Sequence, residues 1–365
     1  MTGAGVATVA RQEFRLRIRA GRWRLLLALF FLVLLGFTVL LRVGLSNLSP
    51  QEVEFRGTVL YGGLMLFVLG LALLVVPALA AQSVNGDRER GTLAVLQVTR
   101  LSAGDIALGK LAAAWGTALV FLALTAPLVG YAMSEGGVPV GRVIVVTLVL
   151  ALLLGTVCAI SLFLSTVLAR TTTSGVLAYL TVFGLTIGTL IVFGLATAVT
   201  AEQYTQTFEQ TCPTAAELPP DIPAAEREVI LTRCTPGTES FESTRTRTDR
   251  TWWLLAPNPF VVLADAAPSL PEPGPGSTEA LTRRAADLDP LGQIGRQVRD
   301  LRQPDPEPVS GSAPLEPVPL DVPDPSPVWP TGLAVNAALG VAAMVLTTRR
   351  LRTPSRRLPK GQRVA

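Results

Sequence analysis

Residues 58–82 read TVLYGGLMLFVLGLALLVVPALAAQ, and not one side chain in this stretch carries a charge. An α-helix rises about 1.5 Å per residue, so about twenty such residues cross a hydrocarbon core of roughly 30 Å. A helix on the surface of a soluble protein carries polar residues along its outer face. The stretch therefore predicts a helix that crosses a membrane.

Five further uncharged runs resemble this one: residues 25–41, 111–133, 143–168, 171–200 and 331–348. Of all 365 residues, 49% are hydrophobic and only 16% are charged, and the mean hydropathy is +0.46. Basic residues precede the first run, as in a signal peptide. However, Arg42 follows it in place of a small-residue cleavage site, so we expect a retained helix. We predict an all-α integral membrane protein with six transmembrane helices.

Basic residues predict the orientation of these helices. If the N-terminus is cytoplasmic, residues 1–24, 83–110, 169–170 and 349–365 lie inside. They hold 18 of the 31 Lys and Arg residues but 4 of the 27 Asp and Glu residues. Because cytoplasmic flanks of membrane spans collect Lys and Arg, we predict a multi-pass protein of the cytoplasmic (cell) membrane with both termini in the cytoplasm. The basic inner face suits membrane lipid with anionic headgroups, and we expect no nucleic-acid partner.

The segment 201–330 then lies outside the cell, and its composition differs from that of the rest. It contains 22 of the 28 prolines, so we interpret it as a long Pro-rich insertion that is largely extended linker. We expect order in two parts, roughly 201–250 and the apolar 252–266, which suits the outer leaflet. Cys212 and Cys234 lie in this segment. An oxidising compartment favours a disulfide between them, and the alternative is two free thiols.

Several kinds of chemistry are missing from the sequence. The chain has no histidine, which excludes imidazole acid–base catalysis and imidazole metal ligands. No charged residue lies within the six runs, although transporters driven by ion gradients usually carry such residues at bilayer depth. No phosphate-binding GxxxxGK[ST] loop occurs. We therefore predict no catalytic residue, no metal site and no cofactor bound by this chain, and expect its energy to come from another subunit.

Small residues recur at four-residue spacing in two of the runs. Gly184 and Gly188 form a GxxxG pattern, and Gly332, Asn336 and Gly340 share one helical face. Small residues allow membrane helices to approach closely. The two interpretations are ordinary packing within one protomer and a close helix contact at a dimer seam or along a translocation path.

The most informative stretch lies between the second and third runs: residues 85–111, NGDRERGTLAVLQVTRLSAGDIALGKL. Its alternating charges at 87–90 suit pairing with one another or with a partner surface. A short amphipathic segment follows, in which Leu93 and Leu96 are apolar. Ser102 then precedes Asp105 by three residues, the pattern of a helix N-cap with an acid in the first turn. We predict a short helix held across the membrane surface between two spans.

Two parts of this stretch, ERGTL (89–93) and LSAGDIALGKL (101–111), resemble the characteristic loop of ABC-2 type ABC transporter permeases. That family includes the nitrous-oxide-reductase maturation permease. The segment APNPFVVLADA (256–266) is also similar to a short family segment, whereas Arg100 and Leu101 stand where the family commonly has a proline. The matching loop positions are Glu89, Gly91, Thr92, Leu93, Ser102, Ile106, Gly109 and Lys110.

The resemblance implies one half of an exporter. Two copies of this permease, as a homodimer, or one copy with a sister permease, as a heterodimer, would associate with two ABC ATPase subunits that bind ATP and magnesium. Residues 85–105 would form the coupling helix that contacts the ATPase. The coupling residues implied are Asp87, Arg88, Glu89, Arg90, Gly91, Thr92, Leu93, Leu96, Ser102 and Asp105.

The basic N-terminal stretch 11–24 would be an amphipathic helix at the inner membrane surface. Its residues support this independently, because apolar and basic side chains fall on different helical faces. The apolar residues are Phe14, Ile18 and Leu25, and the basic ones are Arg15, Arg19 and Arg22. The alternative is a simple basic flank that orients the first span.

The predicted order along the chain is a cytoplasmic N-terminus (1–24), five spans with the coupling loop (25–200), the external segment (201–330), a sixth span (331–348) and a basic cytoplasmic tail (349–365). The leading functional hypothesis is an ABC-2 permease. The alternative is a non-transporting membrane anchor that presents the external segment as a binding or sensing module.

Overall fold

A computed structural model describes residues 2–19, 21–47, 55–89, 91, 101–210, 223, 228, 237–268, 288–303 and 326–352. The chain divides into two units. The larger comprises residues 1–191, 253–299 and 327–365, and the smaller comprises residues 192–252 and 300–326.

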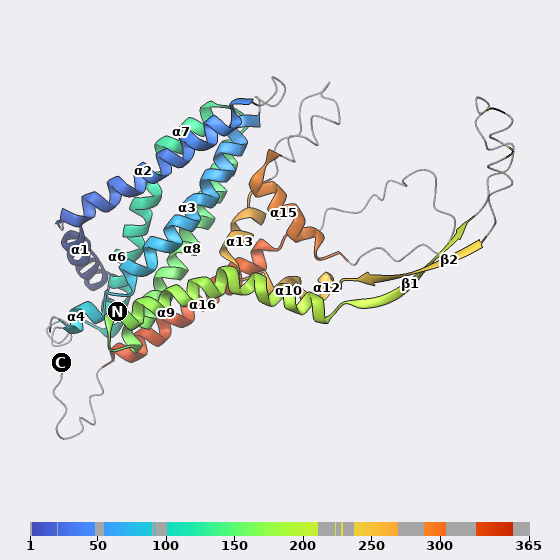
Figure 1. The fold of residues 1–365 in the computed structure, drawn as a ribbon. Helices are drawn as coiled ribbons and strands as arrows, with labels where there is room; N and C mark the ends of the chain where they lie inside the picture. The colour runs from blue at the N-terminus through green and yellow to red at the C-terminus, as the bar shows by residue number, and fades with distance from the viewer. Residues whose placement is uncertain are drawn as a thin grey trace. The chain divides into compact units, whose positions relative to one another are not determined.

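Among the described residues, six helical stretches are long and apolar enough to cross a membrane (Figure 1). Each covers one of the predicted runs to within a residue, so the all-α integral membrane fold with six spans is confirmed. The six stretches are Trp23–Gly44, Arg56–Glu89, Ala103–Ser134, Val140–Val167, Thr171–Val199 and Trp329–Leu351.

The larger unit is built from these spans and a few shorter helices. Its elements are α1 (Gly3–Arg19), α2 (Gly21–Gly44), η1 (Leu45–Asn47), α3 (Arg56–Ala80), α4 (Asn85–Glu89), α6 (Ala103–Ala123), α7 (Ala126–Ser134), α8 (Val140–Val167), α9 (Thr171–Phe183), the π-helix η3 (Gly184–Gly188), α13 (Pro259–Asp265), α15 (Pro290–Asp300) and α16 (Trp329–Leu351). Pro127 lies in the first turn of α7, where its missing N–H is tolerated, and the third span is interrupted just before it.

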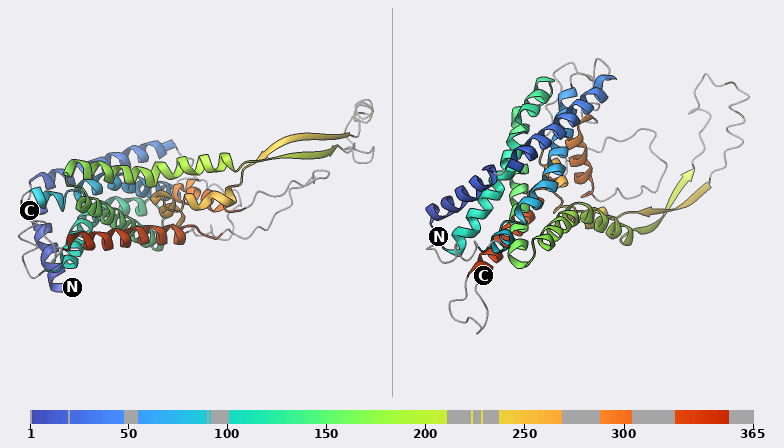
Figure 2. Two further views of the ribbon diagram at one scale, coloured as in Figure 1. Left: turned by 90° about the horizontal axis from the view of Figure 1, so that it is seen from below. Right: turned by 60° about the vertical axis from the view of Figure 1, so that its left-hand side comes forward.

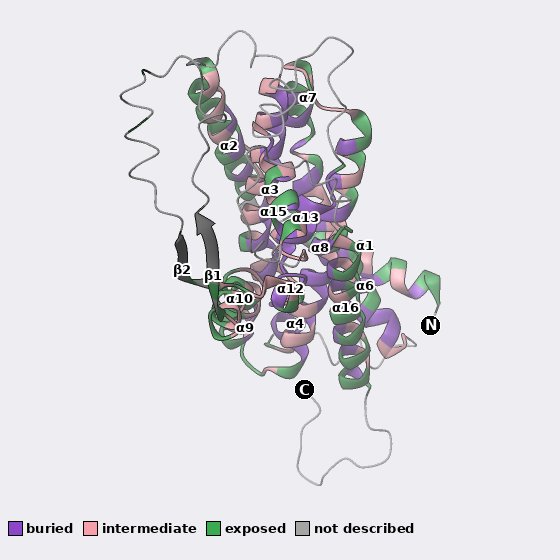
Figure 3. Cartoon of the chain, turned by 90° about the vertical axis from the view of Figure 1, so that its right-hand side faces the viewer, coloured by how far each residue is buried: buried purple, intermediate pink, exposed green. Residues whose placement is uncertain are grey.

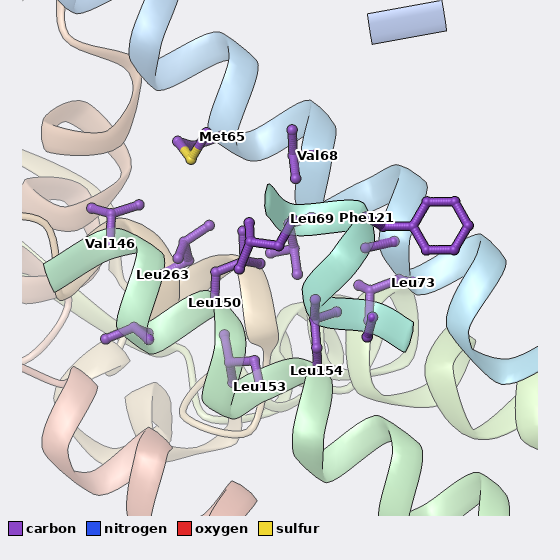
Figure 4. Packing of buried hydrophobic residues seen from close by; sticks show 14 of the residues in the cluster. Met65, Val68, Leu69, Leu73, Phe121, Val146, Leu150, Leu153, Leu154 and Leu263 are labelled. Atoms are coloured by element: carbon purple, nitrogen blue, oxygen red, sulfur yellow. The ribbon is translucent and has the colours of Figure 1, made fainter. Parts of the chain in front are cut away.

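Helices α3 and α8 form the centre of the bundle (Figure 4). Leu69 of α3 and Leu150 of α8 are fully buried, and Phe121 of α6 packs into the same cluster. Because lipid tails are as apolar as leucine, such contacts stabilise the bundle by close packing rather than by removal from water. Figure 3 shows α3 and α8 largely buried.

The two ends of the described chain meet at one end of the larger unit (Figure 2). There Ile106 of α6, Leu162 of α8 and Leu351 of α16 form a second apolar cluster with Val84. Helix α1 packs along α6 at the same end. Helix α1 and the end of α16 therefore lie at the same end of the unit, each in contact with α6.

The opposite end of the bundle is covered by α13 and α15. Residues Val261–Ala267 are all buried, so the apolar segment predicted to suit the outer leaflet packs instead among α3, α8 and α16. Helix α15 lies in a region that we interpreted as linker. Leu291 and Val298 face the bundle at helical spacing, and the surrounding prolines concealed this periodicity.

Two ion pairs fasten this covering layer. Arg142 Nη2 of α8 donates to both carboxylate oxygens of Asp289 at 2.7 Å, and both side chains are almost fully buried. Arg299 Nε of α15 donates to Asp265 Oδ1 at 2.5 Å. The other Asp265 oxygen accepts the N–H groups of Val328 and Trp329 at 2.6 Å, which holds the start of α16.

The fifth span is largely exposed along its length (Figure 3). It runs through α9 and η3 into α10 (Thr189–Val199). Exposed apolar residues include Leu180, Phe183 and Leu195. In a membrane this surface contacts lipid or another protein.

The smaller unit contains a two-stranded antiparallel hairpin, which the all-helical prediction did not include. Strands β1 (Glu202–Gln210) and β2 (Gly237–Arg245) pair from Glu202 opposite Arg245 to Gln210 opposite Gly237. The short helix α12 (Thr248–Thr251) follows, and then the 3-10 turn η4 (Trp252–Leu254). Arg247 bonds Asp249 and Glu202 at 3.1 Å, and this pairing lowers the pKa of Asp249.

Candidate functional site

The loop predicted to contact a partner begins with α4, and two neighbouring helices fasten this short helix. The N–H groups of Val84 and Asn85 donate to Ser165 Oγ of α8 at 3.2 and 3.1 Å. Arg88 Nη1 donates to the carbonyl of Leu168, just beyond α8, at 3.2 Å. Glu89 accepts the Thr171 hydroxyl at the start of α9 at 2.9 Å. A displacement of α4 therefore acts directly on the fourth and fifth spans.

Lys110 of α6 connects α4 to the N-terminal helix. Its side chain has no exposed surface, and its ammonium group donates to Glu13 of α1, to Asp87 of α4 and to the carbonyl of Ser83 at 3.0 Å. A buried ammonium group is costly unless anions and hydrogen-bond acceptors surround it. We call these three charged residues, Glu13, Asp87 and Lys110, the ionic hub.

Gly109 allows α1 to approach α6 beside the hub. A Cβ atom built on Gly109 would lie 2.6 Å from Val9 Cβ and 3.1 Å from the carbonyl oxygen of Val6. No real side chain fits in that space. Gly109 and Lys110 therefore both position α1: the glycine leaves room for α1 to pack closely against α6, and the lysine forms an ion pair with Glu13 of α1.

Ser102 and Asp105 form the predicted N-cap of α6, which is confirmed. Ser102 Oγ accepts the N–H of Asp105 at 3.1 Å, and Asp105 Oδ2 accepts the N–H of Ser102 at 3.0 Å, a complete capping box. Asp105 Oδ1 also accepts the N–H of Thr2 at 2.9 Å. The cap thus fastens the beginning of α1 as well.

The structure brings together part of the set predicted to couple to an ATPase. Asp87, Arg88 and Glu89 lie in α4, but Asp87 is buried against Lys110 rather than presented to a partner. Gly91 is exposed with φ of +71°, a left-handed conformation that favours glycine. Arg90, Thr92, Leu93 and Leu96 lie outside the described residues.

The two sets of small residues differ in their surroundings. Gly332 packs against the carbonyl of Ala256, and Gly340 packs against Thr156. Asn336 Nδ2 donates to the carbonyl of Pro257 at 3.2 Å. These three residues of α16 therefore contact other parts of the same chain.

By contrast, Gly184 and Gly188 of η3 have open space where a side chain would stand, although η3 itself contacts α13. A Cβ at Gly184 would meet nothing within 4 Å, and one at Gly188 would meet only the carbonyl of Phe183 in its own helix. Cys212 and Cys234 lie outside the described residues. Cys158 is a buried free thiol within α8.

The sequence did not reveal the buried charges. Glu13 lies 97 residues from Lys110, and Arg142 lies 147 residues from Asp289. A local sequence pattern therefore cannot predict either ion pair. The one signal available was Lys110 itself, the last position of the family motif. Within the described residues, no group of three His, Cys, Asp or Glu side chains comes together in a way that would hold a metal ion.

Residues 7–231 match the model of a protein family described as "ABC-2 family transporter protein". The match covers more than half of the chain and includes most of α1, the α4 loop and α6, and thus all three residues of the ionic hub. It concerns the family in general and does not bear on the narrower likeness to the nitrous-oxide-reductase maturation permease. No curated protein matches the chain by sequence.

Proposed function

The chain belongs to the ABC-2 family of transporter proteins, and on that premise we propose that it is the permease of an exporter powered by a separate ABC ATPase. The ATPase would bind ATP and magnesium, and this chain would open and close a path across the cell membrane. Export is the direction that the resemblance of the 85–111 loop implies.

The ionic hub is the observation that supports this proposal most strongly. It joins the loop between the second and third spans to α1 and α6, while Ser165, Leu168 and Thr171 join the same loop to the fourth and fifth spans. A partner that displaces α4 would therefore displace several helices together. This is the mechanical connection that an external ATPase requires.

The charge distribution supports a cytoplasmic position for this end of the bundle. Arg11, Arg15 and Arg19 of α1 and Arg349 and Arg350 of α16 are all exposed. Lys and Arg collect on the cytoplasmic side of membrane proteins. An ATPase in the cytoplasm would then have direct access to α4.

A second permease completes the proposed assembly, as an identical copy or a sister chain. The exposed fifth span supports this, because a Cβ built on Gly184 would meet nothing within 4 Å and one built on Gly188 would meet only the carbonyl of Phe183. Small residues at four-residue spacing allow two membrane helices to pack closely. Two permeases would associate with two ATPase subunits.

The test uses the full chain co-expressed with its ABC ATPase and reconstituted in lipid. Spin labels on α2 and α15 report whether ATP changes the distance between these helices. Asp87→Asn removes the ion pair between α4 and Lys110, and we expect this variant to retain the ATPase but to lose the ATP-dependent distance change. Glu135→Gln is the matched control.

Glu135 lies just beyond α7, at the far end of the span that begins with α6, where Tyr131 donates to it at 2.6 Å and Arg42 at 3.1 Å. The hydrogen bond from Tyr131 is the largest influence that lowers the pKa of Glu135. Glu135→Gln also removes ion pairs, those with Arg42 and Arg56, but both are remote from α4. A chain that retains no ATPase, or an Asp87→Asn variant that moves like the wild type, would overturn the proposal.

A further inference from the structure

Helix α1 has an inner face that is fully occupied by contacts within the chain. Val9 is only 3% exposed against Gly109, and Glu13 bonds Lys110. Arg17 Nη1 donates to Thr117 Oγ1 at 3.1 Å. These contacts fix which side of α1 faces away from the bundle.

The outer face of α1 carries a row of three arginines without partners. Arg11, Arg15 and Arg19 follow one another at four-residue spacing, and all three are exposed. None of them has a hydrogen bond or an ion pair in the structure. With Gln12 and Leu16 they line a groove of about 600 Å³ along the helix. We call this the arginine groove.

The described residues that line the groove include no acidic side chain. Like charges four residues apart on a helix repel one another and destabilise it. Glu13 is the one acidic residue of α1, and its carboxylate is directed to Lys110 on the opposite face. An external anion between the guanidinium groups would therefore relieve the repulsion.

The position of the groove indicates which kind of anion it would bind. The first span begins at Trp23, about one helical turn beyond Arg19, so the row extends to the edge of the membrane. Leu16 and Ile18 are 64% and 44% exposed beside it. A helix with arginines and apolar side chains on its free surface suits the boundary between headgroups and acyl chains. Among the described residues that line the groove, none is an aromatic residue on which a nucleotide base would stack.

We propose that the arginine groove is a binding site for the phosphate headgroups of anionic phospholipids. The guanidinium groups donate to phosphate oxygens, for which their planar geometry is well suited, and Leu16 contacts the acyl chains. The lipid would neutralise the row and hold α1, and with it Glu13 of the hub, at the membrane surface. The inference rests on the geometry of α1 and does not depend on the transport role.

The experiment titrates the full-length chain in detergent with phosphatidylglycerol or phosphatidylcholine and counts bound lipid by native mass spectrometry. The test variant combines Arg15→Gln with Arg19→Gln. The matched control combines Arg349→Gln with Arg350→Gln, which removes the same charge from exposed arginines at the same end of the bundle. Gln12→Glu is a second test variant that adds a negative charge to the groove.

We expect the α1 double variant to bind phosphatidylglycerol about 25-fold more weakly, since each basic residue near an anionic surface contributes about fivefold. Gln12→Glu should weaken binding in the same direction, the control should change little, and phosphatidylcholine binding should be equal in all proteins. Equal weakening in the α1 variant and the control would overturn the site, because it would indicate diffuse electrostatics. Displacement of phosphatidylglycerol by millimolar inorganic phosphate alone would overturn the assignment to lipid.

Discussion

Lys110 determines how the loop is connected to the rest of the molecule. Its ammonium group has no contact with solvent and bonds carboxylates 97 and 23 residues away in the chain. Such a cluster is stable only while all its members are present, because removal of one leaves buried charges without a partner.

We expect Lys110→Met to lower the free energy of unfolding by about 3–5 kcal/mol, because the buried Asp87 and the partly buried Glu13 would lose their shared cation. Thermal unfolding in detergent measures the loss. Addition of Glu13→Gln to Lys110→Met should recover part of it, since one unpaired charge is then removed. Strictly additive losses would contradict direct coupling between Glu13 and Lys110.

Gly109 offers a second test at the scale of one residue. Gly109→Ala places a methyl group within 2.6 Å of Val9, so α1 must move away from α6. We expect faster hydrogen exchange in residues 3–19 and a lower melting temperature. Gly116→Ala is the control, because a Cβ there meets nothing within 4 Å and alanine favours the helix. Similar behaviour of the two variants would show that close approach at Gly109 is unimportant.

The elements of the bundle were predictable where the signal was local. Each span is an uncharged run long enough to cross a bilayer, and the capping box at Ser102 is a short-range pattern. Helix α15 was missed although Leu291 and Val298 lie one seven-residue repeat apart, because prolines dominate the composition around it. The position of α15 against α8 depends on the ion pair between Arg142 and Asp289. No sequence rule predicts a contact between residues so far apart in the chain.

Helix α15 should detach from the bundle when its buried ion pair is broken. Asp289→Asn leaves the Arg142 guanidinium buried without a counter-charge, which costs about 3–5 kcal/mol. We expect hydrogen exchange in residues 290–300 to accelerate while α3 stays protected. Gln297→Ala, at an exposed position of the same helix, is the control. Unchanged exchange in the Asp289→Asn variant would mean that the pair does not hold α15.

The disulfide between Cys212 and Cys234 stays a prediction, because both cysteines lie outside the described residues. Gln210 and Gly237 are paired in the register, and Cys212 and Cys234 lie two and three residues beyond them along the chain. We expect alkylation of the denatured, unreduced protein to label only Cys158, and reduction to expose two more thiols. A bond that closes a loop of about 20 residues would stabilise the hairpin by about 3 kcal/mol. Labelling of all three cysteines without reductant would contradict the disulfide.

At the scale of the whole molecule, the membrane unit divides its charges between its two ends. One end is formed by α1, α4 and the C-terminal turn of α16, and it carries exposed arginines and the ionic hub. The other end is formed by α13 and α15. There the ion pairs Arg142–Asp289 and Arg299–Asp265 hold the helices in place. The sequence indicated the basic end through its flanking arginines. The end formed by α13 and α15 depends on contacts between segments that are far apart in the chain, and these contacts cannot be predicted from composition.

The central claim is that the loop beginning at α4 is where an ATPase acts on this permease. The most direct measurement is cysteine cross-linking in membranes that contain both proteins, in a background without Cys212 and Cys234. Glu89→Cys, at an exposed position of α4, should give a permease–ATPase product whose yield depends on ATP, and Glu135→Cys at the far end of the third span should give none. Cross-linking from Glu135→Cys but not from Glu89→Cys would contradict the account.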